Sequence, residues 1–260
     1  MKGNEQNTIP GIEIKTLSAF IDETTKNMGR NFGKIYYRGE NCEKNILIPR
    51  LHKLALDKNK KNNVSFLEKN LLMSFYQEAP ELEKQTNNLY EKLTIAQHYG
   101  LPTRLLDWTA SPLVALWFAL NKDFKKLNVA CVWGIRTSRE VISDLSHPLE
   151  NQITFENIEH QAGSQKGKFF LMHPKKVIDR SIFQNSIFTV HSTDQRLDES
   201  IDKFCEKNCQ DNIDLTKYYI KPIHKITILK ELYSVGVNAY TVLGNYDSLA
   251  RKVKYLHVDI

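Results

Sequence analysis

The chain has 260 residues, of which 41% are hydrophobic and 25% are charged, a balance that excludes a disordered or fibrous protein. The 36 Lys and Arg residues exceed the 30 Asp and Glu residues, and the formal net charge of +6 favours a polyanionic partner without requiring one. No stretch approaches the ~18 apolar residues of a membrane span, the N-terminus lacks the apolar core of a signal peptide, and the four cysteines include no CxxC pair. We therefore expect a cytoplasmic protein without a membrane-bound part.

The first half of the chain carries mainly helical patterns and one short strand. Apolar residues spaced by three or four predict helices, and the β-rich run before Gly39 predicts a strand whose last side chains project at the sheet edge. Ser111 and Pro112 suit the N-cap and first turn of an apolar helix, which we expect to be buried. In chain order we predict a helix between Ile12 and Met28, a strand over 34–40, helices over 66–75 and 82–99, an extended stretch over 103–108, and the buried helix over 113–120.

The second half carries most of the strands. Short apolar runs bounded by polar residues predict strands over 129–135, 167–172, 186–191 and 217–223. A long polar connection separates the first two strands, and the polar stretch 194–214 is expected to form a loop or lid. A helix over 226–233 that ends at Gly236 and a short helix over 248–253 complete the chain. The pattern predicts one α+β domain over residues 1–260, with helices early and a mixed central sheet.

Two segments form a specific combination of motifs. They are YYRGE at 36–40, followed by LIPRL at 47–51, and AQHYGLPTRLLDWT at 96–109, followed by SPL at 111–113 and ALWFA at 115–119. Together they closely resemble the FRG domain, a bacterial and phage family named for its (F/Y)RG tripeptide. The resemblance continues at QKGKF, residues 165–169, and at the segment 228–253, so that it spans residues 14–255.

This resemblance implies a layout like that of ADP-ribosyltransferases, with NAD as the substrate. In that superfamily a first strand ends in Tyr-Arg-Gly or Tyr-His-Gly, a central strand, turn and helix enclose the nicotinamide, and a late strand carries Glu, Asp or Gln. Such a site needs a cation for the pyrophosphate, an aromatic wall for the nicotinamide, and an acceptor that stabilises the oxocarbenium-like transition state.

The YRG tripeptide supplies the cation. Arg38 offers a rigid guanidinium fork for phosphate oxygens, and Gly39 permits close approach of a ligand to the backbone. Tyr37 is a further cofactor-binding candidate by the resemblance. The alternative for Arg38 is an ion pair at the strand end, for which Glu40 is the candidate partner.

The second motif places further polar and aromatic side chains beside a helix end and a proline-fixed turn. Arg104 is a candidate for contact with phosphate or nucleic acid. Asp107 is a candidate for accepting a hydrogen bond from Arg104 or from a ribose hydroxyl. The alternative is a buried Arg104–Asp107 pair that braces the turn. Trp108 is a candidate for stacking on the nicotinamide, or else a core residue. His98 and Thr103 are cofactor-binding candidates by the resemblance, and the alternative for His98 is a structural hydrogen bond.

Gln165 is the candidate for the late acceptor. Its amide can bond a ribose hydroxyl and orient NAD, but it carries no negative charge that would stabilise an oxocarbenium ion. Glu159, Glu199 and Asp107 are the candidates for the missing carboxylate, and the sequence does not choose among them. We expect Arg38, Gln165 and Asp107 to be the catalytic residues.

The most basic stretch of the chain runs from Lys44 to Lys61, with six Lys or Arg residues and one acidic residue, Asp57. It predicts either a solvated helix face or a surface that contacts RNA or DNA. The candidates for phosphate contact are Lys58, Lys60 and Lys61.

These observations predict an NAD-dependent ADP-ribosyltransferase that modifies a macromolecule, preferably RNA or DNA, as a toxin or effector in phage defence. The setting follows from the family resemblance alone. Two alternatives are a non-catalytic module that binds a nucleotide or nucleic acid, and an effector subunit controlled by an antitoxin. No metal is expected, because the CxxxC formed by Cys205 and Cys209 lacks a second tight pair of ligands.

Overall fold

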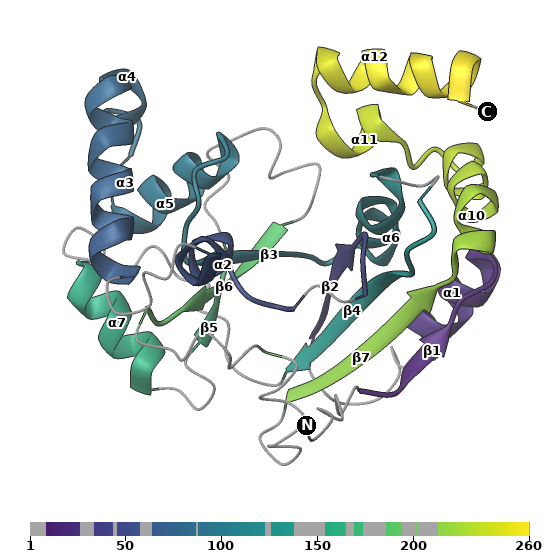
Figure 1. Ribbon diagram of the computed structural model, residues 1–260, viewed down its shortest axis with the longest axis horizontal. Coiled ribbons are helices and arrows are strands. Elements are labelled where there is room, and N and C mark those ends of the chain that lie inside the picture. Colours follow the sequence, from purple (N-terminus) through teal and green to yellow (C-terminus); the bar gives the residue numbers. More distant parts are fainter. Residues whose placement is uncertain are drawn as a thin grey trace. The chain divides into compact units, whose positions relative to one another are not determined.

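The computed structural model (Figure 1) contains two compact units, each assembled from segments that are distant in the sequence. Unit 1 comprises Met1–Asn45, Ser111–Arg139 and Cys205–Ile260, and unit 2 comprises Ile46–Ala110 and Glu140–Phe204. Both contain helices and strands, so the predicted α+β class is confirmed. The structure describes residues 9–26, 34–43, 46–57, 64–86, 88–122, 126–137, 154–164, 169–173, 186–193, 201 and 213–259.

Unit 1 is built on four strands in the order β1-β7-β4-β2. Strand β1 is parallel to β7, whereas the β7–β4 and β4–β2 pairs are antiparallel, so this sheet is mixed as predicted. The strands are β1 (Gly11–Glu13), β2 (Lys34–Glu40), β4 (Ala130–Thr137) and β7 (Ile213–Ile220). The helices are α1 (Leu17–Thr25), α6 (Pro112–Asn121), α10 (Pro222–Ser234), α11 (Ala239–Leu243), α12 (Tyr246–Lys254) and the π-helix η3 (Tyr255–Asp259).

One face of this sheet carries the core of unit 1. Tyr37, Val132 and Tyr218 belong to one buried cluster with the apolar residues of α6 and α10. Helix α6 begins as predicted, because Pro112 occupies the first turn and the Ser111 side chain accepts from the backbone N–H of Val114. The prediction that α6 is a core helix is confirmed, since most of its side chains are buried.

In the described part of unit 2, three antiparallel strands lie in the order β3-β6-β5. They are β3 (Leu105–Thr109), β5 (Phe169–Met172) and β6 (Ser186–His191). The helices are α2 (Arg50–Asp57), α3 (Val64–Glu78), α4 (Pro80–Glu83), α5 (Leu89–His98) and α7 (Phe155–Ser164). Side chains from α3, α5 and α7 form one buried cluster with Leu105, Phe188 and Val190 on the strands.

Several boundaries differ from the predicted ones for local reasons. The helix predicted over 82–99 is two helices, because Asn88 caps α5 by accepting from the backbone N–H of Glu91. Helix α1 begins only at Leu17, after Thr16 has capped it, and Ile12 lies in a strand. Strand β7 ends at Ile220 because Pro222 starts α10.

Helix α7 lies in the stretch predicted to be a polar connection. The loop or lid predicted over 194–214 lies almost entirely outside the described residues. Within the described ranges, each helix is too short or too polar to cross a membrane.

Candidate functional site

Arg38 and Glu40 form an ion pair on β2, in unit 1. The Arg38 Nε donates to Glu40 Oε1 over 2.7 Å, and a terminal guanidinium nitrogen lies 2.7 Å from the same oxygen. Residues two apart on a strand share a face, so the pair needs no distortion of the backbone. The side chains of Arg38 and Glu40 are 22% and 13% exposed, so the arginine is oriented by the pair and its side chain remains partly exposed. The predicted partner of Arg38 is thus confirmed.

Tyr37 and Gly39 have structural roles on the opposite face of β2. Tyr37 is 2% exposed within the core of unit 1, and burial raises the pKa of its hydroxyl. A Cβ on Gly39 would lie 1.9 Å from the carbonyl oxygen of Ala115 and 2.6 Å from the backbone nitrogen of Ala119. The close approach that Gly39 permits is therefore that of α6, and the expectation that a ligand occupies this space is wrong.

A row of side chains crosses the Arg38 face of the unit 1 sheet. Arg38 is opposite Trp133 on β4, and Trp133 is opposite Lys217 on β7. The Lys217 Nζ lies 5.6 Å from the centre of the Trp133 ring and 3.3 Å from Glu43 Oε2. The sequence reasoning missed Lys217, although the alternation of Lys217, Tyr219 and Lys221 along the predicted strand places the three on one face.

Arg104 is a buried ion-pairing residue of unit 2. Its side chain is fully buried, and it contacts Glu68 on α3 through Nε (2.7 Å) and a terminal nitrogen (2.6 Å). Its other terminal nitrogen lies 2.9 Å from Glu159 on α7. The predicted contact of Arg104 with phosphate and its predicted pair with Asp107 are both wrong. Arg104 precedes β3, and the Asp107 side chain accepts a hydrogen bond from Gln97 instead.

Glu159 is also committed to this network. Burial opposes its ionisation, but hydrogen bonds from Ser192 and Thr193 and the charge of Arg104 outweigh that effect and lower its pKa to about 2. A carboxylate held by so many donors is a poor general base, because it has little tendency to take up a proton. Glu159 is withdrawn as the missing catalytic carboxylate because both of its oxygens are already bound by Arg104, Ser192 and Thr193.

Trp108 belongs to a buried polar chain on the face of β3 opposite to Asp107. It is 2% exposed, and its indole N–H donates to Thr189 Oγ1 over 3.1 Å, which in turn lies 3.0 Å from His191 Nε2. The core alternative for Trp108 holds, and the prediction that it stacks on a nicotinamide is wrong. Close by, His52 Nε2 donates to the Ser192 carbonyl over 3.0 Å, and burial lowers the pKa of His52 to about 4.

Asp107 differs from its neighbours because its side chain is exposed in an otherwise buried strand. Gln97 on α5 donates through Nε2 to Asp107 Oδ1 over 2.6 Å, and the Thr103 hydroxyl donates to Gln97 Oε1. His98, the partly buried next residue of α5, packs edge-on against Tyr99. The motif thus brings Gln97, Thr103 and Asp107 into one hydrogen-bonded chain. The prediction gave Gln97 no role, although it lies inside the motif.

Other predicted site residues lie outside the described part of the chain. These are Gln165, Glu199, Lys58, Lys60 and Lys61. Cys205 and Cys209, for which no metal site was predicted, also lie outside it. From the basic stretch, α2 is described, and it exposes Arg50 and Lys53 while it buries Leu51 and Ala55. Among the described residues, no group of three or more His, Cys, Asp or Glu side chains is arranged to hold a metal ion.

The fold and the Arg38 site define an α+β protein with a partly exposed arginine held near the end of a strand. Residues 33–127 match the family model of the FRG domain, which supports the resemblance over that segment. The match contains both β2 with Arg38 and the α5–β3 motif with Asp107. The segments 165–169 and 228–253, which were also expected to resemble the family, lie outside the match. No curated protein and no solved structure matched the chain.

Proposed function

We propose that the chain is an NAD-dependent ADP-ribosyltransferase that modifies a macromolecule, preferably RNA or DNA, as a cytoplasmic toxin or effector in phage defence. The observation that carries this proposal is the Arg38–Glu40 pair. A guanidinium oriented by a carboxylate and still partly exposed suits the pyrophosphate of NAD, because an arginine fork binds two phosphate oxygens at once. The FRG-domain match includes this arginine, and the net charge of +6 favours a polyanionic acceptor.

In this proposal the carboxylate is Asp107. Of the three candidates, Glu159 is bound to Arg104, Ser192 and Thr193, and Glu199 is not described. Asp107 is exposed, and Gln97 fixes one of its oxygens. An exposed carboxylate with a fixed orientation is suited to stabilise developing positive charge. Gln165 keeps its proposed part in orienting NAD.

Substitution of Arg38 by alanine is expected to reduce transfer of labelled ADP-ribose at least ~100-fold, because the pyrophosphate loses its charge-assisted contact. The variant should be less stable by about 1–3 kcal/mol but still folded, since the substitution removes one partner of the largely buried Glu40 carboxylate. The assay incubates the protein with NAD labelled in the ADP-ribose moiety and with RNA, DNA and protein in separate reactions. Thermal melting checks that the variant is folded.

Arg251→Ala is the matched control, because Arg251 is an exposed arginine on α12 in the same unit. It should transfer ADP-ribose like the wild type. A folded Arg38→Ala protein with full activity would remove Arg38 from the site, and label that appears on none of the three acceptors would reject the transferase.

A second candidate function is a binding module that recognises a nucleotide or nucleic acid without turnover. Arg104 forms ion pairs with Glu68 and Glu159, so neither Arg104 nor Glu159 is available for catalysis. This observation favours the binding module. Saturable binding of labelled RNA or DNA, with no covalent transfer from NAD under the same conditions, would support this module.

The nucleic-acid partner is tested through the salt dependence of binding. If Lys58, Lys60 and Lys61 contact phosphates, the logarithm of the affinity falls linearly with the logarithm of the salt concentration, by ~0.7 per phosphate on a single strand. The triple variant with Gln at these positions should therefore bind more weakly and with a flatter slope. Fluorescence anisotropy at several salt concentrations measures both slopes, and identical slopes would assign this stretch to a solvated surface.

A further inference from the structure

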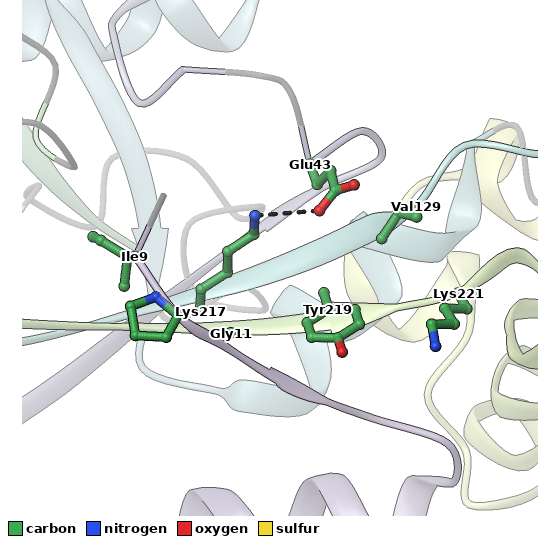
Figure 2. A pocket seen from close by; sticks show the side chains of 8 residues that line it. Ile9, Gly11, Glu43, Val129, Lys217, Tyr219 and Lys221 are labelled. Atoms are coloured by element: carbon green, nitrogen blue, oxygen red, sulfur yellow. Dashed lines mark hydrogen bonds and ion pairs between the residues drawn. The ribbon is translucent and has the colours of Figure 1, made fainter. Parts of the chain in front are cut away.

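A cavity of ≈300 Å³ lies on the β1–β7 side of unit 1 (Figure 2). Lys217 and Tyr219 line it from β7, and Lys221 lines it from the residue after β7. Ile9 and Pro10 line it from the chain that leads into β1, and Gly11 lines it as the first residue of β1. Glu43 and Val129 complete the lining, and the backbone N–H of Glu43 donates to the Val129 carbonyl over 2.8 Å. This hydrogen bond fixes the backbone of the wall, so that only the side chain of Glu43 needs to move when the cavity fills.

Lys217 is the buried charge of this cavity. The residue is 8% exposed, and Figure 2 draws its ammonium group directed at the Glu43 carboxylate, 3.3 Å away. The two partners differ in environment, because the Lys217 side chain is 10% exposed and that of Glu43 is 35% exposed. Glu43 can therefore turn toward water at little cost, whereas Lys217 stays in place against the Trp133 ring.

A buried lysine whose carboxylate partner can move away is suited to exchange that partner for another anion. The exchange never leaves the ammonium unpaired, which is the costly state for a buried cation. A phosphate group carries about −1.5 to −2 charges near neutral pH, more than the single charge of glutamate, so it is the better partner for Lys217. Lys221 adds a second cation to the lining, although Glu13 already lies 3.1 Å from it.

The remaining walls suit a planar, partly apolar group. The Tyr219 side chain lies between the two lysines, and Ile9, Pro10 and Val129 supply apolar surface. A volume of ≈300 Å³ is at the small end of the range for ligand sites, which fits one nucleotide and excludes a large cofactor. We propose that this cavity binds a phosphate-bearing ligand of mononucleotide size, whose phosphate replaces Glu43 on Lys217.

This proposal goes beyond the proposed transferase function, because neither Arg38 nor Asp107 lines the cavity. Isothermal titration calorimetry with AMP, adenosine and inorganic phosphate tests it. AMP should bind, and adenosine should bind at least ~10-fold more weakly, because it lacks the phosphate that pairs with Lys217. Inorganic phosphate should also bind more weakly than AMP, because it leaves the apolar walls uncovered.

Two substitutions should act in opposite directions. Lys217→Gln should weaken AMP binding ~10-fold or more, whereas Glu43→Gln should strengthen it, because the competing carboxylate is gone. Lys230→Gln is the matched control, since Lys230 is exposed on α10 and lies outside the cavity lining. If Lys217→Gln does not fold, Glu43→Gln alone decides the matter.

Three outcomes would overturn the proposal. The first is that AMP does not bind the wild type, and the second is that the Glu43→Gln protein binds AMP no better than the wild type. The third is that inorganic phosphate binds as tightly as AMP, which would mean that the cavity recognises only an anion. Failure of the transferase is distinguishable from all three, because transfer is measured with labelled NAD and the Arg38→Ala protein, whereas the cavity is tested by AMP binding to the Lys217→Gln and Glu43→Gln proteins.

Discussion

Replacement of Glu68 by glutamine is expected to lower the free energy of unfolding by about 3 kcal/mol or more. Glu68 and the Arg104 guanidinium are both fully buried, and their closest atoms are 2.6 Å apart. Glu68 also accepts from the backbone N–H of Arg104 over 3.0 Å, at the residue before β3. The neutral amide would leave a buried guanidinium with half of its compensating charge, because Glu159 alone remains.

Urea unfolding of the wild type and the variant measures this loss. Glu81→Gln is the matched control, since Glu81 forms an ion pair with Lys84 in which both side chains are largely exposed. Its effect should stay within about 0.5 kcal/mol. If Glu68→Gln were as mild as the control, Arg104 would not depend on Glu68, and its assignment as a structural residue would be lost.

The partners of Arg104 could not be predicted from the sequence, for a physical reason. Glu68 and Glu159 are 36 and 55 positions away, and only the packing of α3 and α7 beside β3 brings them to the arginine. Helix α7 itself was missed, although Phe155, Ile158 and Ala162 pack on one face of it. Its apolar residues are few and stand among polar ones, so that the local pattern resembles a connection.

The Arg38–Glu40 pair could be predicted because it depends on local geometry alone. Strand β2 has the predicted bounds, and residues two apart on a strand lie side by side. The same alternation argues against a shared ligand role for the whole tripeptide, because Tyr37 and Gly39 must face away from Arg38. In the structure that opposite face packs against α6.

The second motif mixes two kinds of residue that the sequence could not separate. Arg104, just before β3, and Trp108 on β3 are buried, whereas Asp107, on the opposite face of β3 from Trp108, is exposed. Burial of a charged residue depends on its distant partners, and these are invisible in a local pattern. The proposed site therefore keeps Asp107 and adds Gln97, which orients it.

Substitution of Gly39 by alanine is expected to lower the free energy of unfolding by about 3 kcal/mol or more, or to prevent folding. The new Cβ would lie 1.9 Å from the carbonyl oxygen of Ala115, a backbone atom that no rotamer change can move away. Either α6 must shift away from β2 or the strand must bend, and both changes disturb a core in which Ala115 and Ala119 are almost fully buried.

Gly163→Ala is the matched control for this substitution. Gly163 lies in α7, and a Cβ there meets no atom within 4 Å, so that the helix should gain roughly 0.5 kcal/mol. Thermal and urea unfolding of both variants measure the difference. If Gly39 instead served the approach of a ligand, Gly39→Ala would keep wild-type stability and lose NAD binding. A stable Gly39→Ala protein would thus return the glycine to the ligand site, whereas an unstable one would assign it to the packing of α6.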